Sequence, residues 1–137
     1  MDPAAREEFL AAKHVGVLSV ARREGPPLTV PVWYSYRPGG DVVVHTGPGS
    51  VKFRLLEAAG EFSLLAQDET PPYKYVSVEG PVVAVEREAS RADREAMAYR
   101  YLDRAQAGAF LEQTKDEPSA QLRMRPRRWY SVDFGAA

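Results

Sequence analysis

Three short apolar runs, separated by turn-forming residues, constrain the fold more than any other feature of this sequence. Residues 15–22 (VGVLSVAR), 28–36 (LTVPVWYSY) and 41–46 (DVVVHT) have the length and the β-branched or aromatic content of strands. The intervening REGPP and RPGG segments contain glycine and proline in combinations that form turns. Consecutive strands joined by short turns pair antiparallel, so we expect this part of the chain to form a β-meander.

The remainder of the chain adds further strands and short helices. Helices are expected in three segments that begin with capping signals: 3–12, 51–60 and, as one or two helices, 90–113. Strands are expected in three more segments: 61–67, 73–86 and, broken at Pro126, 119–134. Gly80 and Pro81 interrupt the second of these, which indicates a bend at the corner of a barrel. Six or seven strands in consecutive blocks favour an α+β, mainly β, antiparallel barrel with flanking helices over a doubly wound parallel sheet.

Length and composition exclude several classes of protein. The 137 residues have the length of one domain (1–137), and 45% hydrophobic with 27% charged residues are typical of a soluble globular protein. No apolar stretch is long enough to cross a bilayer and no signal peptide is evident, so we expect a cytoplasmic protein. The absence of cysteine and the presence of only two histidines argue against disulfides, thiolate catalysis and a metal site. A net charge of −1 gives no general attraction to nucleic acid or to anionic membranes.

The segment HTGPGSVKFR, residues 45–54, places two cations in the first turn of an expected helix. The positive end of the helix dipole disfavours Lys52 and Arg54 there by about 0.3–1 kcal/mol. A bound phosphate would reverse this effect, because the Ser50 hydroxyl, free backbone N–H groups and both cations would converge on it. The alternative is a solvated helix whose cationic side chains lie across neighbouring apolar surface, and the spacing alone leaves both interpretations open.

The run LTVPVWYSY combines a proline with three aromatic residues in one expected strand. Pro31 has no N–H group to donate, which indicates an edge, a bulge or a kink that faces a ligand. Trp33, Tyr34 and Tyr36 suit either a wall for a planar ring or a barrel core, and the residues alone favour the core.

The C-terminal run LRMRPRRWY carries Arg123, Arg125 and Arg127 at alternate positions, which predicts one basic face of a strand. A charged edge strand, a surface for single-stranded nucleic acid and an anion-binding rim for a cofactor tail are all compatible with it. The near-neutral net charge favours the edge strand. His14 and His45 are expected to be packed or hydrogen-bonded, and no catalytic triad or carboxylate pair is evident.

Taken in order, these segments resemble the split-barrel superfamily of flavin and deazaflavin oxidoreductases named after pyridoxamine 5′-phosphate oxidase. The similar segments span most of residues 15–134: VGVLSVARREGPPLTVPVWY, VVVHTGPGSVKFRLL, FSLLAQDETPPYKYVSVEGPV and LRMRPRRWYSVDF. The combination of PVWY, TxxxSxKxR and VxVEG is more specific than any one of these motifs. Within the superfamily, the sequence is most similar to the actinobacterial branch that uses coenzyme F420.

The resemblance implies a homodimer with a cofactor in each cleft between the subunits. The positions implied to bind the cofactor are Val30, Pro31, Val32, Trp33, Thr46, Ser50, Val51, Lys52, Arg54, Gln67 and Trp129. Thr46, Ser50 and Lys52 match residues that hold the cofactor phosphate, and Arg54 continues their motif. Residues 30–33 match the strand that lines the isoalloxazine or deazaflavin ring, and Gln67 matches a position that approaches it. Trp129 and the C-terminal arginines are expected to complete the site from the partner subunit.

Two departures from the family pattern bear on function. Pyridoxamine phosphate oxidases carry a C-terminal arginine–histidine–arginine signature, whereas residues 125–137 contain no histidine, so vitamin B6 oxidation is not expected. Their phosphate motif has an additional arginine where this chain has Val51, which implies a dissociable cofactor.

The resemblance therefore implies an oxidoreductase that binds coenzyme F420 and transfers hydride from the reduced deazaflavin to a conjugated organic acceptor. One alternative is an FMN-dependent oxidoreductase of the same fold. The other is a non-catalytic protein that binds a flavin, haem or another planar ligand. Neither nucleic acid nor membrane is expected as a partner. No acid–base residue is assigned, and Tyr73, Tyr75 or water remain as sources of a proton.

Overall fold

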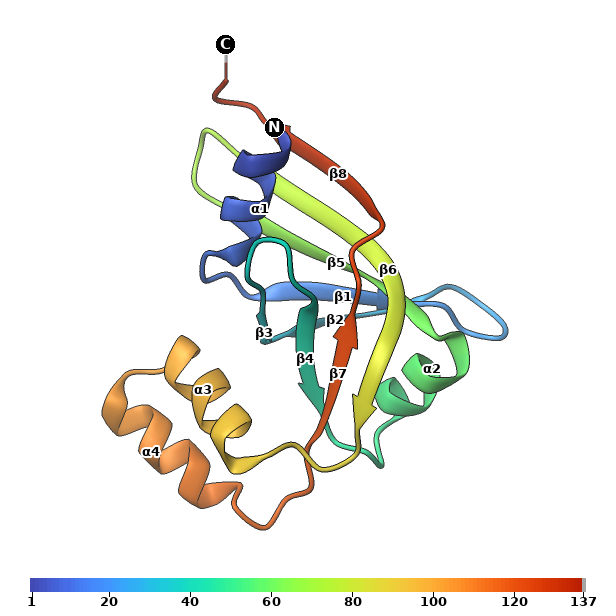
Figure 1. The fold of residues 1–137 in the computed structure, drawn as a ribbon, viewed down its shortest axis with the longest axis vertical. Helices are drawn as coiled ribbons and strands as arrows, with labels where there is room; N and C mark the ends of the chain where they lie inside the picture. The colour runs from blue at the N-terminus through green and yellow to red at the C-terminus, as the bar shows by residue number, and fades with distance from the viewer. Residues whose placement is uncertain (137) are drawn as a thin grey trace.

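The computed structural model describes residues 1–136, which form four helices and eight strands (Figure 1). The helices are α1 (Pro3–Ala11), α2 (Val51–Ala59), α3 (Arg91–Tyr101) and α4 (Arg104–Gln113). The strands are β1 (Gly16–Val20), β2 (Leu28–Val32), β3 (Tyr34–Ser35), β4 (Val42–Thr46), β5 (Glu61–Asp68), β6 (Lys74–Glu86), β7 (Ala120–Met124) and β8 (Arg128–Asp133). The expected α+β class is confirmed. Two expected strands are each divided, residues 28–36 at Trp33 and residues 119–134 around Pro126, which brings the number to eight.

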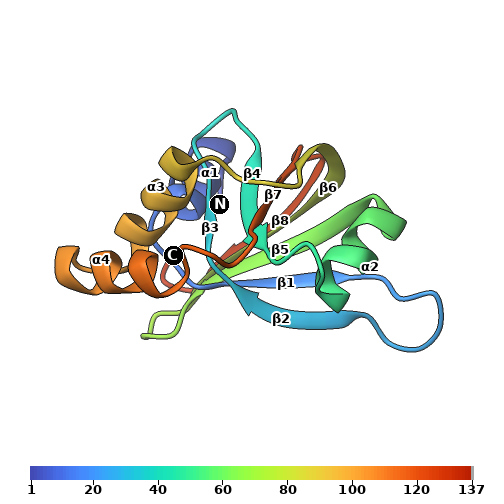
Figure 2. The same cartoon turned by 90° about the horizontal axis from the view of Figure 1, so that it is seen from below.

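The strands form one curled antiparallel sheet in the order β2-β1-β5-β6-β7-β4-β3, with β8 attached to β6. Strand β6 belongs to both halves of the sheet. Its residues Lys74–Glu79 pair with β8, and its residues Val82–Glu86 pair with β7. The long β6 therefore curls the sheet around a single core as a split barrel (Figures 1 and 2).

Gly80 allows the corner in the middle of β6. A Cβ atom at this position would overlap the carbonyl group of Arg125, where the chain passes from β7 to β8. The N–H groups of Arg125 and Arg127 donate across the corner to the carbonyl oxygens of Pro81 and Glu79, both at 2.9 Å. The bend predicted from Gly80 and Pro81 is thus confirmed, and close backbone approach is its physical cause.

The barrel core consists of alternate strand residues that point inward. Its most deeply buried members include Leu18, Val20, Tyr34, Val42, Val44, Leu64, Val76, Val78, Leu122 and Met124. The Tyr34 hydroxyl donates to the carbonyl oxygen of Leu10 at 2.6 Å, so its polar atom is satisfied inside the core. Tyr36 is also buried. The core interpretation therefore holds for both tyrosines of the LTVPVWYSY run.

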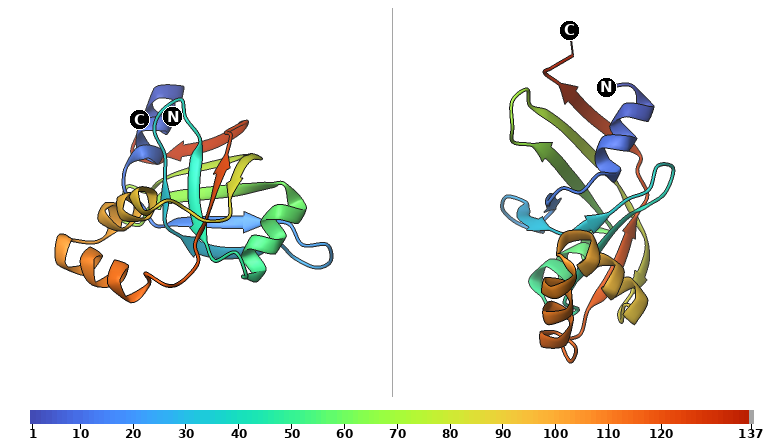
Figure 3. Two further views of the ribbon diagram at one scale, coloured as in Figure 1. Left: turned by 60° about the horizontal axis from the view of Figure 1, so that its bottom comes forward. Right: turned by 90° about the vertical axis from the view of Figure 1, so that its left-hand side faces the viewer.

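Helices α3 and α4 form a pair outside the barrel, on the side of β3 and β4 (Figures 2 and 3). The last turn of α3 attaches this pair to the barrel. Arg100 donates from Nε to the carbonyl oxygen of Tyr34 at 2.8 Å, and the Tyr101 hydroxyl donates to that of His14 at 2.6 Å. None of the helices within residues 1–136 has the length and apolarity needed to span a membrane.

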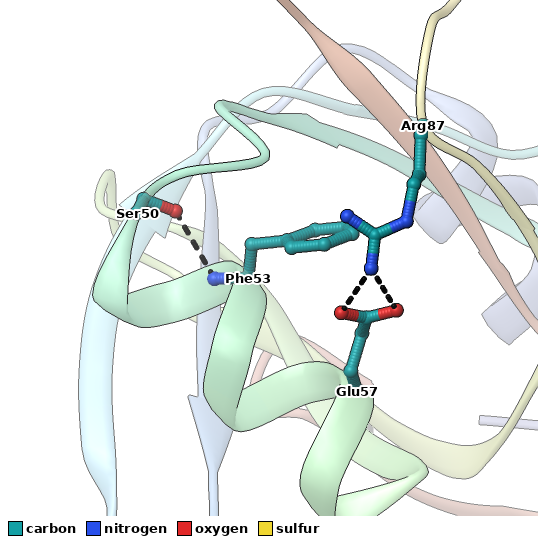
Figure 4. Close-up of polar contacts among 4 residues, drawn as sticks. All are labelled: Ser50, Phe53, Glu57 and Arg87. Carbon is teal, nitrogen blue, oxygen red and sulfur yellow. Dashed lines mark hydrogen bonds and ion pairs between the residues drawn. The ribbon is translucent and has the colours of Figure 1, made fainter.

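Helix α2 packs against β1 and β5 and is also held at its outer side. Arg87, directly after β6, donates to both carboxylate oxygens of Glu57 at 2.9 and 3.1 Å (Figure 4). The same guanidinium lies over the ring of Phe53, 5.2 Å from its centroid. These contacts fix the orientation of α2, and with it the position of its first turn.

Candidate functional site

The first turn of α2 collects hydrogen-bond donors at the end of β4. Ser50 caps the helix, and its hydroxyl accepts a hydrogen bond from the Phe53 N–H at 3.0 Å (Figure 4). Thr46 closes β4 beside it, with its Oγ1 atom 3.2 Å from the Ser50 Oγ atom. The N–H groups of Val51 and Lys52 have no intrahelical acceptor because they belong to the first turn. No acidic side chain lies in this turn to balance the positive end of the helix dipole.

Lys52 is a half-buried cation without a protein counter-ion. It takes part in none of the ion pairs within residues 1–136. Burial lowers the pKa of Lys52 below the ordinary lysine value, because the ammonium group loses hydration without gaining a partner. An anion placed beside Lys52 would oppose this effect.

Lys52 and Thr46 line a cavity of about 350 Å³, which we call cavity A. Residues 31–33 form one wall, the end of β4 forms the floor, and α3, α4 and the loop that follows them cover it. The covering residues include Arg94, Met97, Ala98, Phe110, Leu111, Thr114 and Glu117. A mainly apolar cover above a few polar groups is typical of a small-molecule site, and the volume lies near the lower end for such sites.

The wall of cavity A comes from an edge strand that ends at Trp33. β2 is the terminal strand of the sheet, and Pro31 within it pairs only with β1, so the predicted edge position is confirmed. The Trp33 ring stacks on Tyr101 with centroids 5.0 Å apart and planes at 6°, and its centroid lies 5.2 Å from that of Phe110. Trp33 therefore faces the helical cover, whereas its neighbour Tyr34 points into the core.

Five of the expected cofactor-binding residues line cavity A: Pro31, Val32, Trp33, Thr46 and Lys52. Ser50 does not line cavity A but lies behind Thr46, with 3.2 Å between the two hydroxyl oxygens. Arg54 does not line it and is exposed, because two steps along a helix turn a side chain by about 200° away from Lys52. Val51 is 51% exposed, and Val30 packs against the barrel core.

The structure places Gln67 and Trp129 in other surroundings within the same chain. Gln67 lies in β5 opposite Tyr75 of β6 and is exposed. Trp129 is partly buried against the core, beneath the guanidinium of Arg6 at 4.8 Å and edge-on to Tyr36 at 6.0 Å. Neither residue lines cavity A.

Sequence reasoning missed the helical cover and the position of His45 at the cavity. His45 is hydrogen-bonded, as expected, with its Nε2 atom 2.9 Å from Gln121 Oε1, but it also lines cavity A. Burial lowers the pKa of His45, and this effect outweighs the opposite effect of the bond to Gln121. The available signal for the cover was the apolar pair Phe110 and Leu111 in an otherwise small or polar helical segment.

The expected basic face of the C-terminal run is wrong. β7 ends at Met124 and β8 begins at Arg128, so the three arginines do not share one strand. Arg123 lies beneath α3, Arg125 faces Asp41 with 3.6 Å between Nε and Oδ1, and Arg127 lies beside β5 and β6. Pro126 and the corner at Gly80 separate them physically.

No group of three or more histidine, aspartate or glutamate side chains within residues 1–136 is arranged to hold a metal ion. Cavity A presents the Lys52 cation and the Thr46 hydroxyl beside the backbone donors at the start of α2. That donor set suits a phosphate group rather than a metal.

Comparison with known proteins agrees with the fold. Among similar solved structures, one is described as an F420 reductase, with 20% identity and a TM-score of 0.72 over 90% of this chain and 94% of that chain. A conserved hypothetical protein from Mycobacterium tuberculosis is 21% identical, with a TM-score of 0.74 over 98% and 86% of the two chains. A FAD-binding protein from Mesorhizobium loti is 22% identical, with a TM-score of 0.63 over 96% and 92%. At these identities, the likeness shows the fold.

Family membership rests on the sequence itself. Comparison with curated protein sequences gives no significant match. The family model described as pyridoxamine 5′-phosphate oxidase matches residues 2–133, nearly the whole chain. The resemblance drawn from the motifs is confirmed, and this protein belongs to the pyridoxamine 5′-phosphate oxidase family.

Proposed function

We propose that this protein is an oxidoreductase that binds coenzyme F420 in cavity A. The observation that carries the proposal is the position of Lys52 in the first turn of α2, where this half-buried cation lines cavity A. It has no counter-ion within residues 1–136. Thr46 and Ser50 add hydroxyl groups beside it. A phosphate at this point would satisfy the donors and offset the desolvation of the ammonium group.

Other residues of cavity A suit the planar ring of such a cofactor. Residues 31–33 present an edge strand and an aromatic side chain as a wall for a planar ring. Met97, Phe110 and Leu111 cover the opposite side and would exclude water from it. When bound, the reduced deazaflavin supplies a hydride to a conjugated organic acceptor. The role of the chain is to hold the phosphate, orient the ring and shield the reacting face.

We also propose that the protein acts as a homodimer, in which the partner subunit completes the cofactor site that begins at cavity A. The outer face of β6 and β8 carries Tyr75 stacked near Tyr130 and Phe134, with centroid separations of 6.1 and 6.4 Å. Tyr130 and Phe134 are 65% and 66% exposed. Exposed aromatic clusters of this kind mark association surfaces. Gln67, opposite Tyr75, would lie at this interface and could meet the partner's cofactor.

FMN is the alternative cofactor. The similar structure of a FAD-binding protein supports a flavin in this fold, and a phosphate group is common to both kinds of cofactor. The donors around Lys52 would hold either phosphate, and the titration described next decides between the two cofactors. Oxidation of pyridoxamine phosphate is not proposed, because the C-terminal segment lacks histidine.

The proposal is tested by titrating the cofactor-free protein in parallel with F420, FMN and FAD. We expect selective binding of F420, weakened by about 1–3 kcal/mol in Lys52→Ala because a charge-assisted contact is lost. Arg54→Ala is the matched control: it removes a cation from the same turn that does not line cavity A, and we expect a much smaller change.

Each outcome of the titration has a defined meaning. Selective binding of FMN would replace F420 with the alternative cofactor. Equal affinity of Lys52→Ala and the parent would refute the phosphate site in cavity A. Oxidation of the reduced cofactor by an enone would establish an oxidoreductase, whereas binding without turnover across a range of acceptors would leave a binding protein.

A further inference from the structure

A second cavity, which we call cavity B, lies beneath α3 and has a volume of about 580 Å³. Its floor is the outer face of β4 and β7, where Val43 pairs with Arg123 and His45 pairs with Gln121. Met97 of α3 lines both cavities, so A and B share a wall. Cavity B has no part in the function proposed above, and its ligand must be inferred from its own donors.

Gln121 contributes a buried donor without an acceptor. The residue is 2% exposed, and its Oε1 atom is engaged with His45 Nε2 at 2.9 Å. Its Nε2 atom has no hydrogen-bond partner within the described part of the chain. A buried amide group left in this state is costly, so an acceptor supplied by a ligand in cavity B would stabilise it.

Arg123 provides a second free donor two residues further along the same face of β7. Its side chain is half-buried and makes no hydrogen bond or ion pair within residues 1–136. Arg100 differs, because its guanidinium already donates to the carbonyl oxygens of Tyr34, Ala11 and Ala12 at 2.8–3.2 Å. Arg37 also lines cavity B without an ion pair but is exposed, so Arg123 is the half-buried cation of this cavity that remains available for a new partner.

The charge of the lining limits what cavity B accepts. Three arginines, Arg37, Arg100 and Arg123, face two aspartates, Asp41 and Asp93, which leaves an excess of one positive charge. Asp41 is also approached by Arg125 at 3.6 Å. The lining and Arg125 together place more cations than carboxylates around cavity B, which favours an anion as its ligand.

The rest of the lining suits an organic group. Val43, Ala96 and Met97 present apolar surface beside Arg123. A planar carboxylate matches the fork of a guanidinium, and its second oxygen remains available for an amide donor. We propose that cavity B binds a small organic molecule with a single carboxylate, which accepts hydrogen bonds from Arg123 and from Gln121 Nε2.

The test is a calorimetric titration of the cofactor-free protein with benzoate and hexanoate. Benzamide serves as a neutral analogue, and inorganic phosphate serves as the alternative anion. We expect the carboxylates to bind and benzamide to bind at least tenfold more weakly, because the charge-assisted bond to Arg123 is lost. Arg123→Gln should weaken carboxylate binding by about tenfold or more. Arg127→Gln is the matched control, since Arg127 belongs to the same run but lies outside cavity B.

Gln121→Met tests the contribution of the buried Gln121 amide to binding separately from that of the Arg123 charge. It should weaken carboxylate binding severalfold while the protein keeps its cooperative thermal transition. In a proton–nitrogen correlation spectrum, the Gln121 side-chain amide signal should shift on addition of benzoate, and that of Gln67 should not. Failure of both carboxylates to bind, equal binding by Arg123→Gln, or an unmoved Gln121 signal would overturn the proposal. Tighter binding of phosphate than of either carboxylate would reassign cavity B to phosphate.

Discussion

The inside and the outside of the barrel wall are built differently. Inside, alternate residues of every long strand pack together, and the two core tyrosines, Tyr34 and Tyr36, both have their hydroxyls hydrogen-bonded. Outside, α3 and α4 are attached mainly through Arg100, Tyr101 and the stacked Trp33. Two cavities remain between this cover and the strands.

Three donors without a partner in the described part of the chain, Lys52, Gln121 and Arg123, lie at the cavities beneath or beside the cover. A fourth, the buried Nε atom of Arg6, lies on α1 over Trp129 and lines neither cavity. A close-packed core leaves no room for a ligand, whereas a loosely attached layer leaves room and unsatisfied groups. The comparison indicates that the barrel supplies stability and that the layer under α3 and α4 supplies binding.

The largest expected effect concerns the barrel. Gly80→Ala should lower the free energy of unfolding by about 3 kcal/mol or more, because the added methyl group would overlap the Arg125 backbone. Chemical denaturation measures the change. Gly49→Ala is the control, since a Cβ atom there meets nothing within 4 Å, and we expect a change within about 0.5 kcal/mol. Equal stability of Gly80→Ala and the parent would show that the corner is not a constraint.

An intermediate effect is expected at the attachment of the cover. Tyr101→Phe removes the hydroxyl that bonds to His14 and Tyr34, and should cost about 1–2 kcal/mol. Hydrogen exchange should accelerate in α3 and α4 while the amides of β5 and β6 keep their protection. Tyr99→Phe, at an exposed position of the same helix, is the matched control. An equal acceleration of hydrogen exchange in β5 and β6 would show that the barrel and the cover do not open independently.

The smallest effect is expected from Lys52, and it has the opposite sign. Because burial lowers the pKa of Lys52, the unfolded chain binds this proton more tightly than the folded chain does. At neutral pH, burial of the charged amine therefore lowers the free energy of unfolding of the cofactor-free protein. Lys52→Met should therefore be slightly more stable than the parent at neutral pH. The difference should shrink as pH rises from the lowered pKa towards the ordinary lysine value.

Denaturation of both proteins at neutral and alkaline pH measures the effect of Lys52. A parent that is the more stable of the two at neutral pH would indicate that Lys52 has a structural partner in the free protein. Affinity for a phosphate-bearing cofactor should fall as pH rises through the pKa of Lys52, because the anion prefers the protonated amine.

Local features of the sequence were enough to predict most of the fold. The turns REGPP and RPGG, the cap at Ser50 and the corner at Gly80 act through backbone geometry within a few residues, so their positions follow from residue type. Helix periodicity also predicts that the side chains of Lys52 and Arg54 point to different sides of α2. The prediction that Arg54 joins Lys52 at the phosphate, which comes from the family motif, does not take this periodicity into account.

The sequence by itself determined the order of elements, the antiparallel class and the cluster of donors at the start of α2, because short-range propensities and capping decide them. Only the tertiary structure decided that Trp33 faces the cover while Tyr34 enters the core, since strand alternation assigns opposite faces without saying which is buried. The tertiary structure also decided that α3 covers both cavities and that Gln121 and Arg123 lie beneath this helix. These placements depend on contacts between segments far apart in the chain, and no local pattern records them.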